Sequence, residues 1–433
     1  MTKKTGKPRC RFCGSPLQHT FVDLGTQPLC ESYLSYDQLN QMEPFYPLHV
    51  HVCQNCFLVQ LEEYVAPNEI FTEYAYFSSY SETWLKHAEN YVEMITDRLE
   101  LEEKSQVVEI GSNDGYLLQY FVQKGIPVLG VEPAANVAEV AIQKGIPTEV
   151  KFFDIKTANE LAAKKKSADL IIGNNVLAQV PDLNGFVEGL KTLLKPLGVI
   201  TVEFPHLMKL MDENQFDTIY HEHFSYFSFI TVEKLFAAHG LTIFDVEQLP
   251  THGGSLRIYA RRTENESEPV THNVGELITT EREEGFTNLE KYSLFSEKVK
   301  ETKRNLLNLL ISLKRDNQSI VGYGAPGKGN TLLNYCGIRS DFLDYTVDRN
   351  PYKQGKFLPG SHIPIFPPDK IKETKPNYLL VLPWNLKDEI TVQMSYISSW
   401  GGRFIVPIPE LKVYDASLIQ GCNAGQQFNE GCR

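Results

Sequence analysis

The alternation of short apolar runs with helical stretches between residues 105 and 262 constrains the fold more than any other feature of the sequence. Its first unit, QVVEIGSNDGYLLQYF, is typical of a strand, a glycine turn and a helix. The later runs ADLIIGNNVLAQV and LGVITVEFPH are unbroken apolar strands, as expected in a parallel sheet that is covered on both faces. LTIFDVEQL and GGSLRIYARR supply further strands. We therefore predict a doubly wound α/β domain.

The glycine loop after the first of these strands, EIGSNDG at 109–115, predicts the cofactor. It differs from the G-x-G-x-x-G pattern of dinucleotide enzymes and has the E/D-x-G-x-x-x-G form found in methyltransferases that use S-adenosylmethionine. Asn113 or Asp114 can accept hydrogen bonds from the amino-acid part of that ligand. Glu132 ends the second strand at the distance expected for a residue that binds both ribose hydroxyls, which disfavours NADP and leaves NAD as the main alternative. The predicted cofactor-binding residues are Glu109, Gly111, Ser112, Asn113, Asp114, Gly115, Glu132, Pro133, Asn174 and Asn175.

Two Cys-x2-Cys pairs near the N-terminus predict a zinc site. The four thiolates are those of Cys10, Cys13, Cys53 and Cys56, and such a set closes the tetrahedron around Zn²⁺ with no open position for water. We therefore expect a structural metal without a catalytic role. Cys30 is left over as a buried thiol, and the alternative ligands are His19, His49 and His51.

The composition excludes several classes of function. A chain of 433 residues, with 42% hydrophobic and 22% charged residues, is ordinary for a soluble protein of two or three domains. Its formal net charge of −12 argues against nucleic-acid binding, which requires a basic face. No stretch resembles a secretion signal or approaches the roughly 18 apolar residues of a membrane span. We expect a cytoplasmic protein without nucleic-acid or membrane partners, we favour a monomer, and we assign the cysteines to metal binding rather than disulfides.

A second glycine loop, GYGAPGKG at 322–329, begins a second α/β unit. It contains G-x-x-x-x-G-K, but Gly329 follows where a P-loop needs Ser or Thr to hold Mg²⁺, so an ATPase is disfavoured. The backbone N–H groups of such a loop still form an anion site, and Lys328 adds a positive charge, which suits a diphosphate bound without hydrolysis. The alternative is a tight turn with a surface lysine. LDYTVDRNP, NYLLVLPWN and GRFIVPIPEL are predicted as further strands.

These features divide the chain into four modules. We predict a zinc-binding domain at 1–70, a methyltransferase domain at 71–262, a helical connector at 263–317 and a C-terminal α/β domain at 318–433. The methyltransferase domain begins with an aromatic segment, FTEYAYFSSYSETW, in which a helix is predicted from Ser81 onward. The residues just before that helix either pack between modules or form a lid over a ligand site.

Several long motifs, in the same order along nearly the whole chain, resemble the sugar C-methyltransferases, which act on nucleotide-linked 4-keto-6-deoxy sugars. They are CRFCG…CQNC, YFSSYSETW, EIGSNDGYLL, NNVLAQV, TIYHEHFSYFS, THGGSLR, GYGAPGKGNTLLNYCGI and VLPWN. The resemblance implies a zinc-binding N-terminal domain, a central S-adenosylmethionine domain and a C-terminal α/β domain that helps to hold the nucleotide sugar. It also implies that a base removes the C3 proton next to the C4 ketone, and that the enolate attacks the cofactor's methyl group.

The resemblance further implies roles for YHEH at 220–223. His223 is the expected base, Glu222 orients a catalytic ring or binds a sugar hydroxyl, and Tyr220 donates a hydrogen bond to the substrate. His221 is either catalytic or structural. The residues alone also permit a metal site or a polar turn, although zinc already has ligands and this chemistry needs no Lewis acid. The implied substrate-binding residues are Tyr74, Tyr76, Ser79, Tyr80, Gln179, Phe204, Pro205, Tyr226, His252, Gly253, Arg257, Tyr323, Lys328, Asn330, Asn334, Asp348, Arg349, Trp384 and Asn385.

One position departs from the family pattern. Where relatives have N-V-x-A-His, this chain has NVLAQ, and Gln179 can form hydrogen bonds but cannot titrate. The cofactor prediction is unaffected, whereas the methylated carbon depends on how the site works without that histidine. Two alternatives stay open, namely a sugar O-methyltransferase or epimerase-like enzyme, and a non-catalytic protein that binds nucleotide sugars. The sequence does not distinguish dTDP-, CDP- and GDP-linked substrates.

Overall fold

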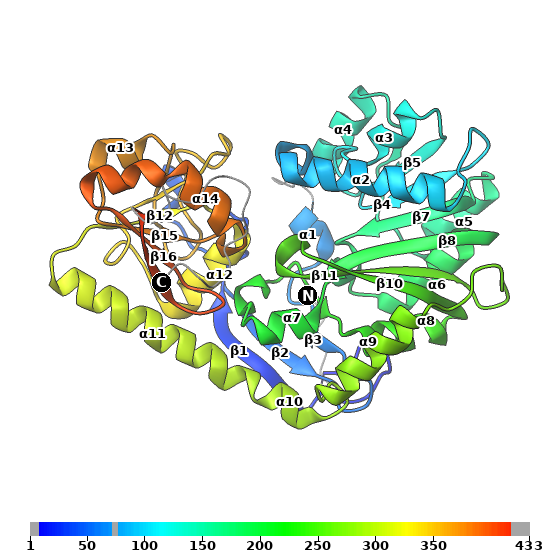
Figure 1. Cartoon of the computed structure of the whole chain (residues 1–433), viewed down its shortest axis with the longest axis horizontal. Helices are drawn as coiled ribbons and strands as arrows, with labels where there is room; N and C mark the ends of the chain where they lie inside the picture. The colour runs from blue at the N-terminus through cyan, green and yellow to red at the C-terminus, as the bar shows by residue number, and fades with distance from the viewer. Residues whose placement is uncertain (1–7, 72–76, 417–433) are drawn as a thin grey trace. The chain divides into compact units, whose positions relative to one another are not determined.

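The computed structural model describes residues 8–71 and 77–416. The chain forms two compact units, and Figure 1 colours it by residue number. The first unit consists of Met1–Phe21, Val50–Lys209 and Glu222–Ser293. The second unit consists of Val22–His49, Leu210–His221 and Leu294–Arg433.

A seven-stranded sheet forms the centre of the first unit, in the order β10-β11-β8-β7-β4-β5-β6. Strands β4 to β8 run parallel, whereas β11 is antiparallel to both β8 and β10. This topology confirms the predicted doubly wound α/β fold, and it brings the carboxyl ends of β4, β5, β7 and β8 to one edge, where such sheets bind ligands. The strands are β4 (Val107–Ile110), β5 (Val128–Val131), β6 (Thr148–Glu149), β7 (Ala168–Asn174), β8 (Leu194–Pro205), β10 (Leu241–Leu249) and β11 (Ser255–Arg262).

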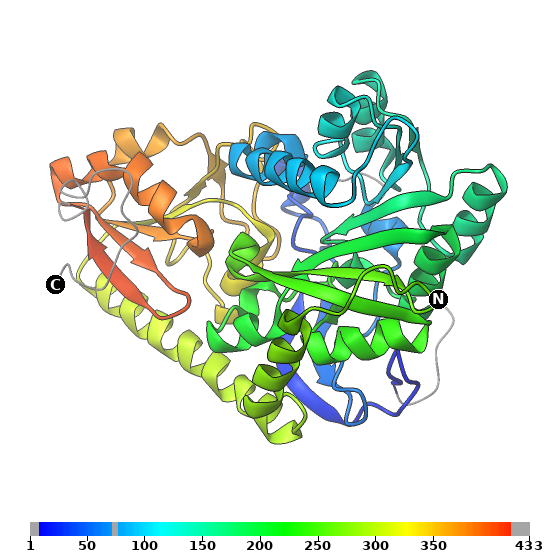
Figure 2. The ribbon, with the colours of Figure 1, turned by 45° about the vertical axis from the view of Figure 1, so that its right-hand side comes forward.

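Helices cover both faces of this sheet. Val107 lies in a core cluster with Tyr91 of α2, whereas its neighbour Val108 lies in a second cluster with Leu190 of α6 and Leu235 of α8. Successive strand residues point to opposite faces, so a sheet covered on both faces requires the unbroken apolar runs seen in the sequence. Figures 1 and 2 show α2 and α8 on opposite sides of the sheet. The helices of this unit are α1 (Pro67–Phe71), α2 (Glu82–Arg98), α3 (Leu118–Gln123), α4 (Ala135–Gln143), α5 (Ile155–Ala163), α6 (Leu183–Leu193), α8 (Phe229–Ala238), α9 (His272–Glu283) and α10 (Leu289–Ser293).

Helix α2 begins where the sequence predicts it. The hydroxyl of Ser81, the N-cap residue, accepts a hydrogen bond from the backbone N–H of Trp84 at 3.3 Å. A cap of this kind contributes about 1 kcal/mol, because it satisfies a backbone donor that has no partner inside the helix. The buried residues recur at helical spacing and form the stripe that packs on the sheet, namely Trp84, Ala88, Tyr91, Val92 and Ile95.

A second, four-stranded sheet joins segments that lie far apart in the sequence. Its order is β1-β2-β3-β9, and β3 pairs antiparallel with β9, with Val59 opposite Tyr226 and Gln60 opposite Ser225. The residues directly after YHEH are therefore held by the strand that follows the second cysteine pair. The strands are β1 (His19–Gln27), β2 (Tyr46–Val52), β3 (Val59–Leu61) and β9 (Ser225–Tyr226).

A six-stranded sheet forms the centre of the second unit, in the order β14-β13-β12-β15-β16-β17, with all neighbours parallel except β16 and β17. The second glycine loop joins β12 to α12, as the sequence predicts. Among the residues that the structure describes, no helix is long and apolar enough to cross a membrane. The elements of this unit are α7 (Leu207–Asp212, shared with the first unit), α11 (Phe295–Arg315), β12 (Ile320–Tyr323), α12 (Gly327–Cys336), β13 (Thr346–Val347), β14 (Ile365–Phe366), α13 (Lys370–Thr374), β15 (Tyr378–Val381), α14 (Lys387–Gln393), β16 (Arg403–Val406) and β17 (Lys412–Asp415).

Candidate active site and metal centre

The first glycine loop lies at the carboxyl end of β4 and is fixed by its neighbours. Glu132, directly after β5, accepts the backbone N–H of Asn113 at 2.9 Å and that of Ala134 at 2.8 Å. Burial raises the pKa of Glu132, and these two backbone hydrogen bonds oppose the shift. The 3-10 helix η2 (Ser78–Tyr80) closes over the loop, because the backbone N–H of Ser78 donates to Asn113 Oδ1 at 2.9 Å. Contacts within the protein therefore define the shape of the loop.

Several buried acceptors at this edge have no protein partner. Among the described residues, no group hydrogen-bonds to Ser112 Oγ, to Asp114 Oδ1 or to Asn175 Oδ1. Glu109 is fully buried, and its burial raises its pKa well above the usual range. Buried polar atoms are normally hydrogen-bonded, so acceptors gathered at one strand edge fit the donors of a ligand. The amino group and hydroxyls of S-adenosylmethionine are such donors, and the loop residues present therefore fit this cofactor.

Aromatic rings form a cluster beside these acceptors. The ring of Trp84 lies 5.8 Å from Tyr116, 5.0 Å from His87 and 5.1 Å from His252, measured between ring centroids. The hydroxyl of Tyr116 accepts a hydrogen bond from Asn174 Nδ2 at 3.3 Å, which ties the cluster to the carboxyl end of β7. An aromatic cluster can stabilise a cationic sulfonium through the negative faces of its rings.

A buried carboxylate, Glu203 near the end of β8, organises the charged groups behind this cluster. Its oxygens accept hydrogen bonds from His87 Nε2 at 2.9 Å, Arg257 Nη2 at 2.9 Å and Thr251 Oγ1 at 2.8 Å. Burial raises the pKa of Glu203, but the hydrogen bond from His87 and the positive charge of Arg257 outweigh burial and hold the pKa below its usual value. Arg257 lies directly opposite Glu203 in the β8–β11 register and also bonds Glu247 at 3.0 Å.

Two residues at the same edge have strained backbone conformations. Asn175 and His252 both have positive φ, at 57° and 55°, and the side-chain nitrogens Asn175 Nδ2 and His252 Nε2 lie 3.1 Å apart. A residue other than glycine in this region is uncommon, and such residues cluster at functional sites. The predicted residues Asn175 and His252 are therefore brought together, whereas Gln179 lies one turn away in the 3-10 helix η3 (Leu177–Gln179).

The YHEH motif lies where the chain passes from the second unit to the first. In the first unit, Glu222 is buried, and the ring of His223 lies edge-on to Tyr226 at 6.2 Å between centroids. In the second unit, buried His221 bonds the carbonyl oxygen of Pro47 through Nε2 at 3.2 Å, and burial lowers its pKa. These contacts favour the structural interpretation of His221, which the sequence leaves open.

The four cysteine thiols of the N-terminal pairs lie together. Their sulfur atoms are all within 4.8 Å of one another, and Cys10–Cys56 and Cys13–Cys53 are each 3.5 Å apart. Sulfur ligands 2.3 Å from a tetrahedral zinc ion stand about 3.8 Å apart, so the cluster fits the metal. Gln60 Nε2 donates to Cys10 Sγ at 3.2 Å and supplies an outer hydrogen bond to the ligand.

In the second unit, the glycine loop holds a lysine over a tryptophan. Lys328 donates to Asn385 Oδ1 at 2.8 Å, and its ammonium lies 4.8 Å from the centre of the Trp384 ring. Trp384 Nε1 in turn donates to Asp217 Oδ2 at 2.8 Å. Burial raises the pKa of Asp217 to about 7, and the charge of Lys328 opposes this shift. The predicted residues Lys328, Trp384 and Asn385 are thus brought together. They lie near the carboxylate of Asp217, which was not among the residues predicted from the sequence.

The other predicted substrate-binding residues have partners within their own units. Phe204 is fully buried against Phe227, and Asn330 is buried and donates to the carbonyl oxygen of Cys30 at 2.6 Å. The remaining contacts are Ser79 Oγ with Lys144 Nζ, Tyr323 Oη with Gln393, Asn334 with the Pro359 carbonyl, Asp348 Oδ2 with the Ala325 N–H, and Arg349 with Glu389. Tyr74 and Tyr76 lie outside the described residues, whereas Tyr80 is exposed, Pro205 ends β8, and Gly253 has a φ of 92°.

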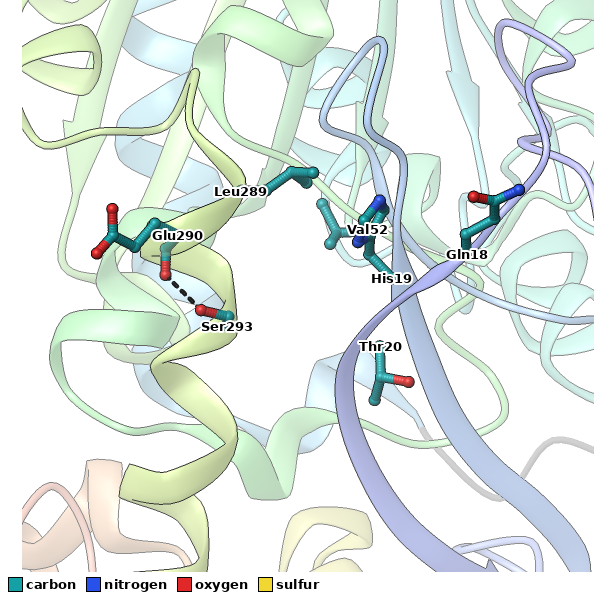
Figure 3. Close-up of a pocket in the computed structure, with 7 residues that line it drawn as sticks. All are labelled: Gln18, His19, Thr20, Val52, Leu289, Glu290 and Ser293. Atoms are coloured by element: carbon teal, nitrogen blue, oxygen red, sulfur yellow. Dashed lines mark hydrogen bonds between the residues drawn. The ribbon is translucent and has the colours of Figure 1, made fainter.

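The first unit also contains a cavity of about 440 Å³ that lies away from the candidate active site. Figure 3 shows it between α10, which contributes Leu289, Glu290 and Ser293, and the strands β1 and β2. None of its lining residues belongs to the carboxyl edge of the seven-stranded sheet. The cavity is therefore separate from the candidate site.

Three protein-family models match the chain in succession. They are described as "Putative zinc binding domain" over residues 10–71, "Methyltransferase domain" over residues 84–246 and "C-methyltransferase C-terminal domain" over residues 250–409. The C-methyltransferase NovU of Streptomyces niveus is 37% identical over 407 residues, which cover 94% of this chain and 97% of that protein. The chain belongs to the C-methyltransferase family.

This C-methyltransferase has more limited similarity to other proteins. A ubiquinone biosynthesis O-methyltransferase of Bartonella bacilliformis is 29% identical over 101 residues, or 22% of this chain and 40% of that protein. A solved S-adenosylmethionine-dependent methyltransferase from Clostridium acetobutylicum has a TM-score of 0.34 and 12% identity, covering 41% of this chain and 92% of that chain.

The family and the geometry together establish the class of enzyme. The protein is an S-adenosylmethionine-dependent C-methyltransferase with a zinc-binding N-terminal domain, as the sequence predicts. The four-cysteine cluster and the unpartnered acceptors of the glycine loop fit Zn²⁺ and S-adenosylmethionine respectively.

Sequence reasoning singled out Arg257 but missed its partner Glu203 and the nearby His87. A signal was present, because Glu203 is a carboxylate inside the otherwise apolar run LGVITVEFPH. His87 lies three residues after Trp84 and therefore on the same side of α2. His87 and Glu203, however, are 116 positions apart in the chain, and only the fold brings them together.

Proposed function

We propose that the enzyme methylates carbon 3 of a nucleotide-linked 4-keto-6-deoxy sugar. The observation that carries the proposal is the set of unpartnered acceptors at Ser112, Asp114 and Asn175 among the described residues, next to an edge that also presents His252. Transfer of a methyl group to carbon needs a nucleophilic carbon beside the bound cofactor. A ketone at C4 provides one, because it acidifies the C3–H bond and delocalises the resulting negative charge onto oxygen.

In this proposal His223 removes the C3 proton and carries it as an imidazolium, while the electron pair of the C3–H bond enters the enolate. The bound cofactor supplies an electrophilic methyl group, so that a C3–methyl bond forms as the sulfur–methyl bond breaks. Tyr220 donates a hydrogen bond to the developing enolate oxygen, and Glu222 orients the imidazole or a sugar hydroxyl. Histidine suits the base because its ordinary pKa is near neutral pH.

We also propose that the second unit, taken by itself, offers a site for a diphosphate. Lys328 is the second residue of α12, where helix N–H groups and the lysine charge favour a diphosphate. Its contacts with Asn385 and Trp384 hold the ammonium in one place, which distinguishes it from a freely moving surface lysine. The chain of hydrogen bonds continues from Trp384 to Asp217, so a change at any of these side chains is expected to weaken substrate binding.

Deuterium exchange tests the role of the base directly. The 4-keto sugar is incubated in D₂O with the enzyme and S-adenosylhomocysteine, and NMR follows loss of the C3 proton signal. We expect wild-type enzyme to exchange this proton and His223→Asn to slow exchange at least 100-fold, whereas His272→Asn, at an exposed position, leaves it unchanged. Equal exchange by wild type and His223→Asn excludes His223 as the base.

A further inference from the structure

The zinc-binding loop makes contacts well beyond its own metal site. Arg11 lies between the ligands Cys10 and Cys13 in the sequence. Its Nη1 donates to the carbonyl oxygen of Pro181 at 3.0 Å, and its Nη2 donates to the carbonyl oxygen of Leu61. The same guanidinium lies 5.5 Å from the centre of the Phe224 ring. A single side chain therefore contacts three segments.

The contacts are reciprocal. Asn184, near the start of α6, donates through Nδ2 to the carbonyl oxygens of Arg11 at 3.1 Å and Phe12 at 3.0 Å. The loop between the first two zinc ligands is thus fixed to the segment 177–184, which carries Gln179. Two backbone carbonyls held by one half-buried amide leave the loop little freedom to shift relative to that segment.

Gln60 links a zinc ligand to the segment that follows His223. Its Oε1 accepts the backbone N–H of Arg11 at 2.9 Å, while its Nε2 donates to Cys10 Sγ at 3.2 Å. Gln60 lies in β3 opposite Ser225 of β9. Next along the strand, the backbone N–H of Leu61 donates to the carbonyl oxygen of Phe224 at 3.0 Å.

The second cysteine pair, Cys53 and Cys56, also contacts the chain that follows His223, at Thr231. Thr231 Oγ1 donates to the carbonyl oxygen of Cys56 at 3.1 Å. The backbone N–H of Phe224 also donates to the carbonyl oxygen of Ala178 at 2.8 Å, which joins the two segments to each other. Strand β9 has two residues, too few to hold a position alone, so these contacts help to fix the segment that directly follows His223.

We propose that Arg11 is a positioning residue through which zinc binding fixes the segment 222–231 and the segment 177–184. A bound metal defines the path of the chain from Cys10 to Cys13, and Arg11 transmits that geometry to Pro181, Leu61 and Phe224. The guanidinium is only partly exposed, so its charge depends on these acceptors for compensation. The consequence for catalysis rests on the proposed role of His223.

The expected effect is on the chemical step rather than on cofactor binding. A displacement of about 1 Å in a catalytic group costs on the order of 10²-fold in rate. We therefore expect Arg11→Gln to lower kcat about 10²-fold. The Kd for S-adenosylmethionine should stay within about twofold, because the Arg11 side chain contacts Pro181, Leu61 and Phe224 rather than the cofactor loop.

Hydrogen–deuterium exchange on the zinc-loaded, full-length enzyme tests the coupling without relying on activity. Arg11→Gln is compared with Arg11→Lys and with Arg9→Gln, since Arg9 is exposed and donates within the same loop, to Gly14 at 2.9 Å. We expect Arg11→Gln to retain one equivalent of zinc and to increase exchange in peptides covering 177–184 and 222–231, with 107–131 unchanged. Arg11→Lys keeps the charge but not the forked geometry and gives an intermediate increase, whereas Arg9→Gln matches wild type.

Zinc removal with a chelator provides the second arm. We expect it to increase exchange in the same two segments as well as in 8–61. The proposal is overturned if the zinc-loaded variants Arg11→Gln and Arg11→Lys exchange both segments at the wild-type rate. It is also overturned if zinc removal leaves the exchange of both segments unchanged. If Arg11→Gln does not fold, Arg11→Lys and the chelator decide. A wild-type enzyme that transfers no methyl group to any sugar contradicts the proposed function, yet leaves these exchange results interpretable.

Discussion

Glu203 offers the sharpest test of the structural account, because its carboxylate compensates a buried arginine. Replacing it by glutamine keeps the shape but places an uncharged amide against Arg257, which is only 4% exposed. Removing one partner of a buried ion pair costs about 3–5 kcal/mol, and we expect the lower end because Arg257 retains Glu247 at 3.0 Å. At roughly 2–4 °C per kcal/mol for a domain of this size, the transition of the first unit should fall by about 6–12 °C.

Differential scanning calorimetry of the full-length enzyme measures this shift. Glu160→Gln is the matched control, because Glu160 and Lys151 form an exposed ion pair at 2.7 Å, and its loss should not move the transition. The double variant Glu203→Gln/Arg257→Met should lose less stability than Glu203→Gln alone, since it removes the uncompensated charge. A transition within about 2 °C of wild type for Glu203→Gln refutes the assignment of Glu203 as the counter-ion.

The same carboxylate predicts a dependence on pH. The pKa of Glu203 is lowered in the folded protein, so its contribution to stability is fully present above the unfolded pKa, near 4.3, and is lost as the pH falls through the lower folded value. The stability difference between wild type and Glu203→Gln should therefore narrow below about pH 4. A difference that stays constant from pH 7 to pH 3 contradicts the ionised state of this group.

Three further changes give equally direct outcomes. Burial raises the pKa of Asp217 to about 7, above its ordinary value of 3.8, so the free energy of unfolding should fall as the pH rises between these values. In denaturation measured at several pH values, Asp217→Asn should abolish this dependence on pH. An unchanged dependence on pH contradicts the burial of the Asp217 carboxyl group. A Cβ atom at Gly130 would lie 2.4 Å from Ser112 Oγ, so Gly130→Ala should raise the Kd for S-adenosylmethionine at least tenfold in titration calorimetry. Gly275→Ala is the control, because a Cβ atom there meets open space, and it should leave this Kd unchanged. Cys53→Ser should reduce bound zinc from one equivalent to nearly none by metal analysis, and full retention would exclude a four-thiolate site.

Local sequence patterns predict those parts of the fold whose causes are local. The apolar runs, the glycine loops and the Cys-x2-Cys pairs each specify an element through neighbouring residues, and each lies where it is predicted. Ser81 likewise predicts the start of α2, where it is the N-cap residue. The zinc ligands are recognisable because four thiolates at this spacing have few other uses.

Long-range pairing explains what the sequence did not reveal. Glu203 meets Arg257 through the register of two antiparallel strands, and it meets His87 through the packing of α2 on that sheet. Asp217 acquires its raised pKa only because the fold buries it beside Trp384. No periodicity or motif within the chain specifies such pairings in advance.

The position of the transferred methyl group distinguishes methylation at C3 from the alternative reactions. The enzyme is given ¹³C-methyl-labelled S-adenosylmethionine with dTDP-, CDP- and GDP-linked 4-keto-6-deoxy sugars, and the product is examined by mass spectrometry and by carbon–proton correlation NMR. We expect a ¹³C-methyl group bonded to C3, with loss of the C3 proton and preference for one nucleotide. A label on a sugar oxygen, or no transfer to any of the three substrates, would contradict it.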